Sequence, residues 1–114
     1  MLSYQKLDVY QCSIQFVTLT VLLINKLPRG FFFLVDELKR ASVSIPQNIA
    51  EGAGKPAAAD RSRYFGIARG SAMECGAILD VGVTLKLFSA NDHQKGIELL
   101  ERVVSMLTKM MKIE

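Results

Sequence analysis

The sequence of 114 residues has one histidine, two cysteines and no tryptophan. Cys12 and Cys75 fall in no metal-binding spacing, and so few cysteines are typical of free thiols in a reducing, bacterial-type cytoplasm. A di-iron helical bundle needs paired Glu-x-x-His motifs, which a lone His93 cannot supply. A serine or cysteine nucleophile needs a base close by, whereas we expect His93 to face solvent at the opposite end of the molecule from Asn48. We therefore expect no enzyme, no catalytic residue, no metal and no cofactor.

Long apolar runs and a large excess of one charge are also lacking. The run over 14–27 is interrupted by Gln15, Thr18 and Thr20, and it falls short of the roughly 20 residues that a membrane span needs. Asp8 in the charged region and the lack of an A-x-A site argue against a signal peptide. We expect a cytoplasmic protein with no membrane partner. A net charge of only +3 permits a nucleic-acid partner but does not demand one.

Helix-breaking residues interrupt the chain at three places, with glycine and proline in "KLPRG" (26–30) and "EGAGKPA" (51–57) and with serine, asparagine and aspartate in "SANDH" (89–93). Between these breaks, apolar residues recur three and four positions apart, which is the period of an amphipathic helix. Helices joined by short connections pack as antiparallel neighbours. The sequence therefore predicts one all-α domain over 1–114, an antiparallel up-down-up-down four-helix bundle. The expected helices are about 5–27, 31–52, 58–88 and 91–112.

Each expected helix carries an apolar stripe, and the first and fourth carry a second row beside it. The stripes are Leu7, Tyr10, Ile14, Val17, Val21, Ile24; Leu34, Leu38, Ala41, Ile45, Ile49; Phe65, Ala68, Ala72, Cys75, Leu79; and Ile97, Leu100, Val104, Leu107, Met111. The second rows are Val9, Phe16, Leu19, Leu23 and Leu99, Val103, Met106, Met110. Either the core stripe is wide, or the second rows form a subunit interface. Half of all residues are hydrophobic, which hints at self-association.

Pro46 lies inside the second expected helix and deprives the Ser42 carbonyl of its amide partner. Either a new helix begins at Pro46, a favoured first position, or one kinked helix continues to Glu51. Ile45 and Ile49 keep the apolar phase across the proline, which favours a continuous helix. Gly52 is then expected to end it.

The two later helices differ in their N-terminal caps. Ser89, with Asp92 three residues on, resembles a capping box for the fourth helix. Residues 57–59 are alanines and offer the third helix no side-chain acceptor.

Two stretches, "ASVSIPQNIAEGAGK" (41–55) and "YFGIARGSAMECGAILDVG" (64–82), resemble the pattern of the bacterial 23S ribosomal RNA intervening-sequence protein family. The matching positions are Ala41, Ser44, Ile45, Pro46, Asn48, Ile49, Ala50, Glu51, Gly52, Phe65, Ile67, Ala68, Arg69, Gly70, Ser71 and Glu74. This resemblance implies a small four-helix bundle that forms barrel-shaped homopentamers. A sister group serves as accessory proteins of diversity-generating retroelements, binding nucleic acid and a reverse transcriptase.

The polar members of this pattern are more easily explained by structure than by catalysis. They are Ser44, Asn48, Glu51, Arg69, Ser71 and Glu74. Counting outward from each turn places Ser44 level with Gly66, and Glu74 level with Glu37. Because a buried polar group left unpaired costs about 1–3 kcal/mol, we expect a network that fixes helix register or a subunit contact.

Basic residues concentrate at one end of the expected bundle. Lys6, Lys55, Arg61, Arg63, Lys109 and Lys112 lie there with Asp8, Glu51, Asp60 and Glu114. Repeated round a ring, this end would form a basic rim able to contact phosphates; the alternative is an ordinary solvated end. The expected nucleic-acid contacts are Lys55, Arg61, Arg63 and Arg69, although Arg69 could instead pair with Glu37 or Glu74.

Two functions remain open. The first is a non-enzymatic, oligomeric module that binds RNA, DNA or a ribonucleoprotein, favoured by the basic end. The second is a protein–protein interaction module, for example a reverse-transcriptase accessory subunit, that does not touch nucleic acid. The apolar excess favours the second.

Overall fold

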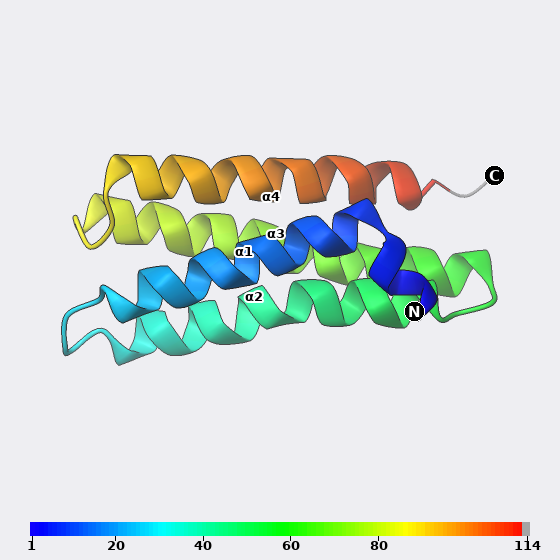
Figure 1. The fold of residues 1–114 in the computed structure, drawn as a ribbon, viewed down its shortest axis with the longest axis horizontal. Coiled ribbons are helices and arrows are strands. Elements are labelled where there is room, and N and C mark those ends of the chain that lie inside the picture. The colour runs from blue at the N-terminus through cyan, green and yellow to red at the C-terminus, as the bar shows by residue number, and fades with distance from the viewer. Residues whose placement is uncertain (113–114) are drawn as a thin grey trace.

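The computed structural model describes residues 1–112 as four long helices preceded by a short 3-10 turn. The turn η1 spans Ser3–Lys6, and the helices are α1 (Asp8–Asn25), α2 (Phe32–Ala53), α3 (Ala58–Thr84) and α4 (Ala90–Met110). Consecutive helices run in opposite directions (Figure 1), and no strand occurs within the described residues. The predicted all-α, up-down-up-down bundle is confirmed. Glu114, counted above at the basic end, lies outside the described residues.

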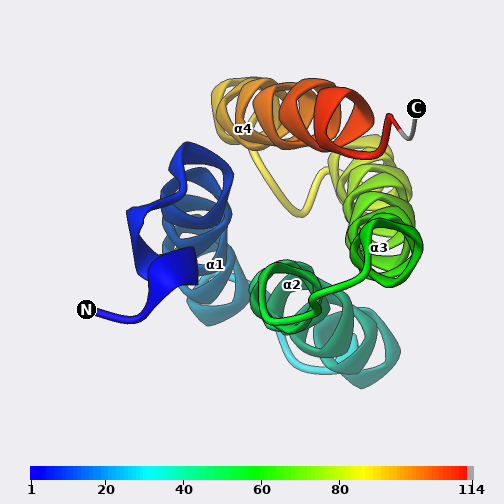
Figure 2. The ribbon, with the colours of Figure 1, turned by 90° about the vertical axis from the view of Figure 1, so that its right-hand side faces the viewer.

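Each helix packs against its two neighbours around the bundle. α1 packs beside α2 and α4, and α3 beside the same two helices, while no Cα atoms of diagonal helices lie within 8 Å of each other in residues 1–112. Seen end-on, the helices occupy four corners in chain order (Figure 2). The molecule is 45 Å long and 23 × 21 Å across, and its two ends hold the connections between helices. We call the end with the α2–α3 turn the turn pole and the opposite end the hairpin pole.

Two predicted helix boundaries are wrong. α1 begins at Asp8 rather than near residue 5, because Leu7 is extended (φ −73°, ψ 131°) after η1. α3 ends at Thr84 rather than 88, because Lys86 takes a left-handed conformation (φ 60°). The Leu87 amide donates to the Gly82 carbonyl (2.9 Å) and the Lys86 amide to the Val83 carbonyl (3.0 Å). These two bonds form a Schellman motif, which normally uses glycine where Lys86 stands.

Pro46 lies within an unbroken α2, so the continuous helix is confirmed. Gly52, in contrast, does not end the helix. α2 runs on to Ala53, and Gly54 caps it by donating its amide to the Ala50 and Glu51 carbonyls. Gly52 is buried instead, and a Cβ placed on it would lie 2.7 Å from the Phe65 ring. The glycine is therefore required for close packing of α2 on α3.

The predicted stripes of α2 and α3 are buried, but that of α1 is wrong in part, because only Leu7, Tyr10 and Ile24 of it pack against the core. Ile14 and Val21 from the predicted stripe are exposed, whereas Val9, Phe16 and Leu23 from the second row form the core. The buried face of α1 also includes three small or polar residues that an apolar pattern passes over, Cys12, Ser13 and Thr20. In α4 the second row widens the core, since Val103 is buried and Leu99, Met106 and Met110 pack against it.

Candidate nucleic-acid interface

Arg61 closes the turn between α2 and α3. Its Nη1 donates to the carbonyl oxygens of Lys55 (3.1 Å) and Pro56 (2.6 Å). Both carbonyls lie in the turn after α2, where they have no helical amide as partner. Arg61 was predicted to contact phosphates, but in this structure its guanidinium is engaged with the turn itself.

Tyr64 brings the two other cations of the turn pole together. Lys55 Nζ lies 5.1 Å from the centre of the Tyr64 ring, and Arg63 Cζ lies 4.4 Å from it. Both distances are within the range of cation–π attraction. Lys55 also lies 3.6 Å from the Glu51 carboxylate, one helical turn before it. The sequence reading missed Tyr64, although its position directly after Arg63 is the signal that could have found it.

An open groove of about 760 Å³ runs beside Tyr64 at the end of α2. It is lined by Gln47, Asn48, Ala50, Glu51, Gly54, Lys55 and Tyr64. The amide side chains can donate and accept hydrogen bonds, Lys55 supplies positive charge, and the Tyr64 ring supplies a flat face. A single nucleic-acid strand is recognised by this combination of cation and aromatic surface.

Arg69 does not belong to this group. Its Nε donates to the Thr108 hydroxyl on α4 at 2.9 Å, so it bridges α3 and α4. The alternative pairing of Arg69 with Glu37 or Glu74 is wrong. Glu74 instead accepts two bonds from Arg40 Nη2, at 2.9 and 2.6 Å, and this carboxylate raises the pKa of Arg40.

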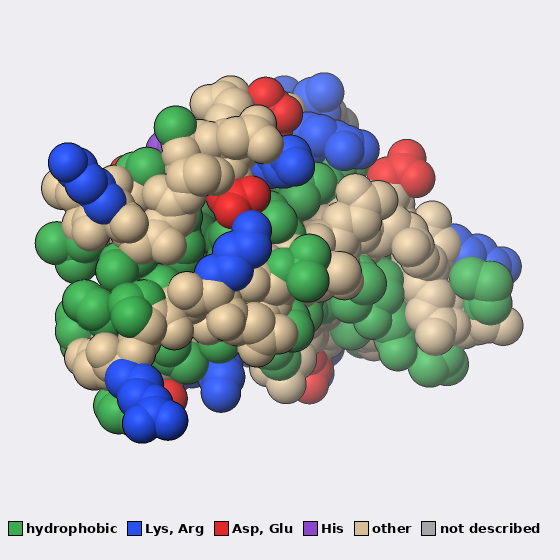
Figure 3. Space-filling view, turned by 60° about the vertical axis from the view of Figure 1, so that its left-hand side comes forward, with side chains coloured by type: hydrophobic (Ala, Val, Ile, Leu, Met, Phe, Trp, Pro, Cys, Tyr) green, Lys and Arg blue, Asp and Glu red, His purple; other side chains and the backbone are tan. Residues whose placement is uncertain are grey.

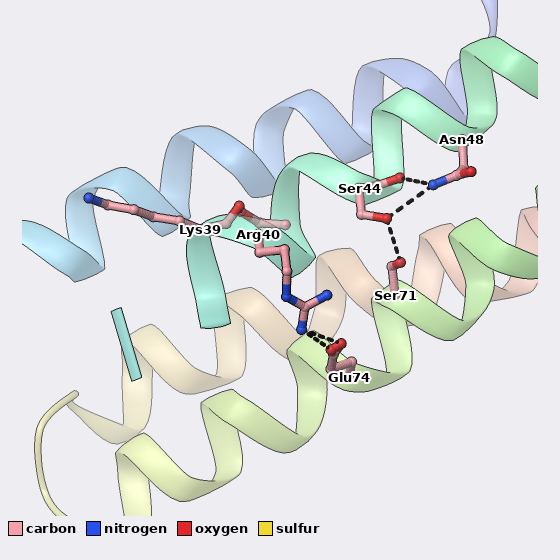
Figure 4. Close-up of polar contacts among 7 residues, drawn as sticks. Lys39, Arg40, Ser44, Asn48, Ser71 and Glu74 are labelled. Atoms are coloured by element: carbon pink, nitrogen blue, oxygen red, sulfur yellow. Dashed lines mark hydrogen bonds and ion pairs between the residues drawn. The ribbon is translucent and has the colours of Figure 1, made fainter. Parts of the chain in front are cut away.

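Three of the six predicted network residues meet between α2 and α3 (Figure 4). The Ser44 and Ser71 hydroxyls are 2.8 Å apart, and Asn48 Nδ2 donates to the Ser44 carbonyl (2.8 Å) and hydroxyl (3.0 Å). Glu51, Arg69 and Glu74 lie elsewhere, with Lys55, Thr108 and Arg40 respectively. The structure thus contains a trio rather than one network of six.

The counted register between α2 and α3 is wrong by five residues, since Ser44 meets Ser71 and not Gly66. At 1.5 Å per residue this is roughly 7 Å along the axis. The chain continues outward after α2, and α3 begins beyond the end of α2 (Figure 1). Counting symmetrically from the turn ignores that advance.

His93 is half-buried rather than solvent-facing, and its Nε2 lies 2.8 Å from the Asp80 carboxylate. A nucleophilic triad contains a histidine oriented by an aspartate, but no serine or cysteine side chain of the described residues hydrogen-bonds to the His93 ring. Cys12 and Cys75 are free and buried. Burial raises the pKa of both thiols, that of Cys75 to about 12, so neither forms the reactive thiolate at neutral pH.

Two further features follow from residues 1–112. No three histidine, cysteine or acidic side chains of this part gather as metal ligands would. None of its helices combines the length and apolarity required to cross a bilayer.

A family model described as 23S rRNA-intervening sequence protein matches residues 5–109, so the chain belongs to this family. None of the curated proteins compared with it is similar in sequence. The crystal structure of a protein with unknown function from the S23 ribosomal protein family of Bacteroides thetaiotaomicron has the same fold. Its TM-score is 0.86 at 20% identity, over 92% of this chain and 99% of that one.

Proposed function

We propose that this member of the 23S rRNA-intervening sequence protein family is a non-enzymatic, oligomeric module that binds RNA, DNA or a ribonucleoprotein. The turn pole, with Lys55, Arg63 and Tyr64, is the contact surface. The observation that carries the proposal is the Tyr64 ring flanked by two cations at 5.1 and 4.4 Å, beside an open groove lined by amide side chains.

The turn pole suits phosphates better than a specific base sequence. Lysine and arginine contacts to phosphate release counterions and add affinity without reading sequence. A base can stack on the Tyr64 ring where one of its two cations moves aside to a phosphate. We therefore expect RNA and DNA to bind with similar affinity and with a steep dependence on salt.

The outer face of α1 supports self-association. From Val9 to Asn25 this helix has no charged residue, and Ile14 and Val21 are exposed on it, two helical turns apart. A surface helix of a monomer normally turns charged side chains outward. A homo-oligomer would cover this face, and a pentamer, as the family resemblance implies, would repeat the turn pole five times. Light scattering tests this, and a monomer at micromolar concentration contradicts it.

A second candidate is a protein-binding module, such as a reverse-transcriptase accessory subunit. The groove between α3 and α4 favours it. This groove of about 530 Å³ has a largely apolar lining that includes Met73, Ala77, Ile97 and Val104. Such a groove is typical of sites that accept an amphipathic helix.

Binding of fluorescent single-stranded RNA and DNA, titrated over a range of salt, separates the two candidates. The double variant Lys55→Gln/Arg63→Gln should make the salt slope shallower by about one unit per lost phosphate contact. Lys95→Gln/Arg102→Gln removes the same charge from α4 and should leave the slope unchanged. If the wild type binds neither nucleic acid in a salt-dependent manner, the protein-binding module replaces the proposal.

A further inference from the structure

The hairpin pole exposes four large apolar side chains. Phe32 and Phe33 at the start of α2 are 74% and 60% exposed, Leu22 near the end of α1 is 56% exposed, and Leu85 after α3 is 50% exposed. We call these four residues the apolar tip. Figure 3 brings this end forward and shows hydrophobic side chains spread over it, interspersed with lysine and arginine side chains and a few acidic ones.

None of the four side chains of the apolar tip belongs to the hydrophobic core. The interior of the hairpin pole is closed by Phe88, which is buried against Gly82. The two connections between helices at this pole add Leu27, Phe31 and Leu87, which pack against the core. Large apolar side chains that gather on a surface without contributing to the core mark a binding surface.

At the very end of the hairpin pole the charges are positive, whereas the exposed acidic side chains Asp36, Glu37 and Asp80 lie about one helical turn further in. Residues 22–33 and 81–91, which form this end, include Lys26, Arg29 and Lys86 and no aspartate or glutamate. Asp92, the next residue of α4, is paired with Lys26 at 3.0 Å. Arg29 and Lys86 are exposed beside the apolar side chains.

We propose that the apolar tip adsorbs to the surface of an anionic lipid bilayer. Phenylalanine and leucine enter the headgroup region while lysine and arginine attract acidic lipids. The expectation of no membrane partner rested on the lack of a spanning segment, and adsorption requires none. Two alternatives fit less well. Base stacking would leave the aliphatic Leu22 and Leu85 without a role, and a second copy would bring two cationic tips together.

The test is co-sedimentation of the full chain with vesicles of phosphatidylcholine, with and without phosphatidylserine. Binding to the phosphatidylserine vesicles is expected. The double variant Phe32→Ser/Phe33→Ser should lower the partition coefficient by about tenfold or more. Arg29→Gln and Lys86→Gln should each lower it roughly fivefold, on phosphatidylserine vesicles only. The matched control Val43→Ser/Ile67→Ser removes two exposed apolar side chains from the middle of α2 and α3 and should change nothing.

A second measurement covers the case in which the serine variant fails to fold. Because the chain has no tryptophan, a single introduced tryptophan reports on its own surroundings. Phe32→Trp should shift its emission to the blue on addition of phosphatidylserine vesicles, and Ile67→Trp should not. The proposal is overturned by lack of wild-type binding, by an equal loss in the control variant, or by equal shifts of the two reporters. It is also overturned if Phe32→Ser/Phe33→Ser lowers the oligomeric mass or oligonucleotide binding instead. Failure of nucleic-acid binding at the turn pole leaves this proposal unaffected.

Discussion

The two poles of the bundle are built alike inside and differ outside. Each is closed by a buried glycine against a phenylalanine ring, Gly52 on Phe65 at the turn pole and Gly82 on Phe88 at the hairpin pole. Outside, cations stack on Tyr64 at the turn pole, whereas at the hairpin pole they surround the apolar tip. Positive charge with different neighbours favours different ligands, phosphate chains at one end and a lipid surface at the other.

The glycines give the largest expected effect. An alanine Cβ at Gly82 or Gly52 would overlap the neighbouring ring, and such overpacking costs about 1–3 kcal/mol. Gly82→Ala should cost more, because its overlap is deeper. Gly70 has open space around it within α3, so Gly70→Ala should instead stabilise by about 0.5–1 kcal/mol. Urea denaturation measures the free energy of unfolding of all three variants. If only one of Gly52→Ala and Gly82→Ala lost stability, the two poles would not be closed in the same way.

Cys75 lies at neither pole, and the titration of its thiol makes the stability of the fold depend on pH. Its pKa rises from 9.0 to about 12 in the fold because burial disfavours the thiolate. The stabilisation by the neutral thiol is complete below pH 9.0 and is lost as pH rises toward 12, by up to about 1.4 kcal/mol per pH unit. The stability of Cys75→Ala should fall less steeply over this window. Equal alkaline slopes for variant and wild type would contradict the assignment.

The caps at the two poles should respond in opposite directions. The Ser89 hydroxyl accepts from the Asp92 amide at 3.0 Å at the start of α4, so Ser89→Ala should cost about 1 kcal/mol. Ala57 precedes α3 at the turn pole without any side-chain cap, and Ala57→Ser should gain a similar amount. Thermal denaturation followed by circular dichroism measures both. Changes of the same sign would show that the caps do not differ as described.

Lys86 gives the smallest expected effect. Its left-handed conformation (φ 60°) costs a residue with a Cβ more than glycine, so Lys86→Gly should stabilise the fold by about 0.5 kcal/mol. The same variant should weaken vesicle binding, because it removes a cation from the hairpin pole. If the variant gained stability and kept full vesicle binding, Lys86 would have no contact with the lipid surface.

The buried face of a helix was predictable where the sequence has a single apolar row, and not in α1, where it has two rows and no charge after Asp8. α2 and α3 each carry a single apolar stripe, and both stripes are buried. α1 carries two, and without charges to mark the outer face the wrong one was chosen. Ser13 and Thr20, both buried polar residues, hid the correct face. The end of α3 was missed because Lys86 takes a conformation that glycine usually signals.

At the candidate site, residue types were predictable and their partners were not. The sequence indicated a basic end, but the roles of Arg61 and Tyr64 depend on the path of the turn, which periodicity does not encode. The outward advance of the chain over 54–57 also shifts α3 against α2. As a result Ser71, not Gly66, meets Ser44, and Glu74 meets Arg40.

The most direct test of the account compares equal charge removal at the two poles. Lys55→Gln/Arg63→Gln and Arg29→Gln/Lys86→Gln each remove two positive charges, and single-stranded RNA binding is measured for both over a range of salt. The account predicts that the first variant loses about two units of salt slope and the second loses none. An equal loss in both variants, which would mean that binding follows net charge alone, or a loss in neither, would contradict it.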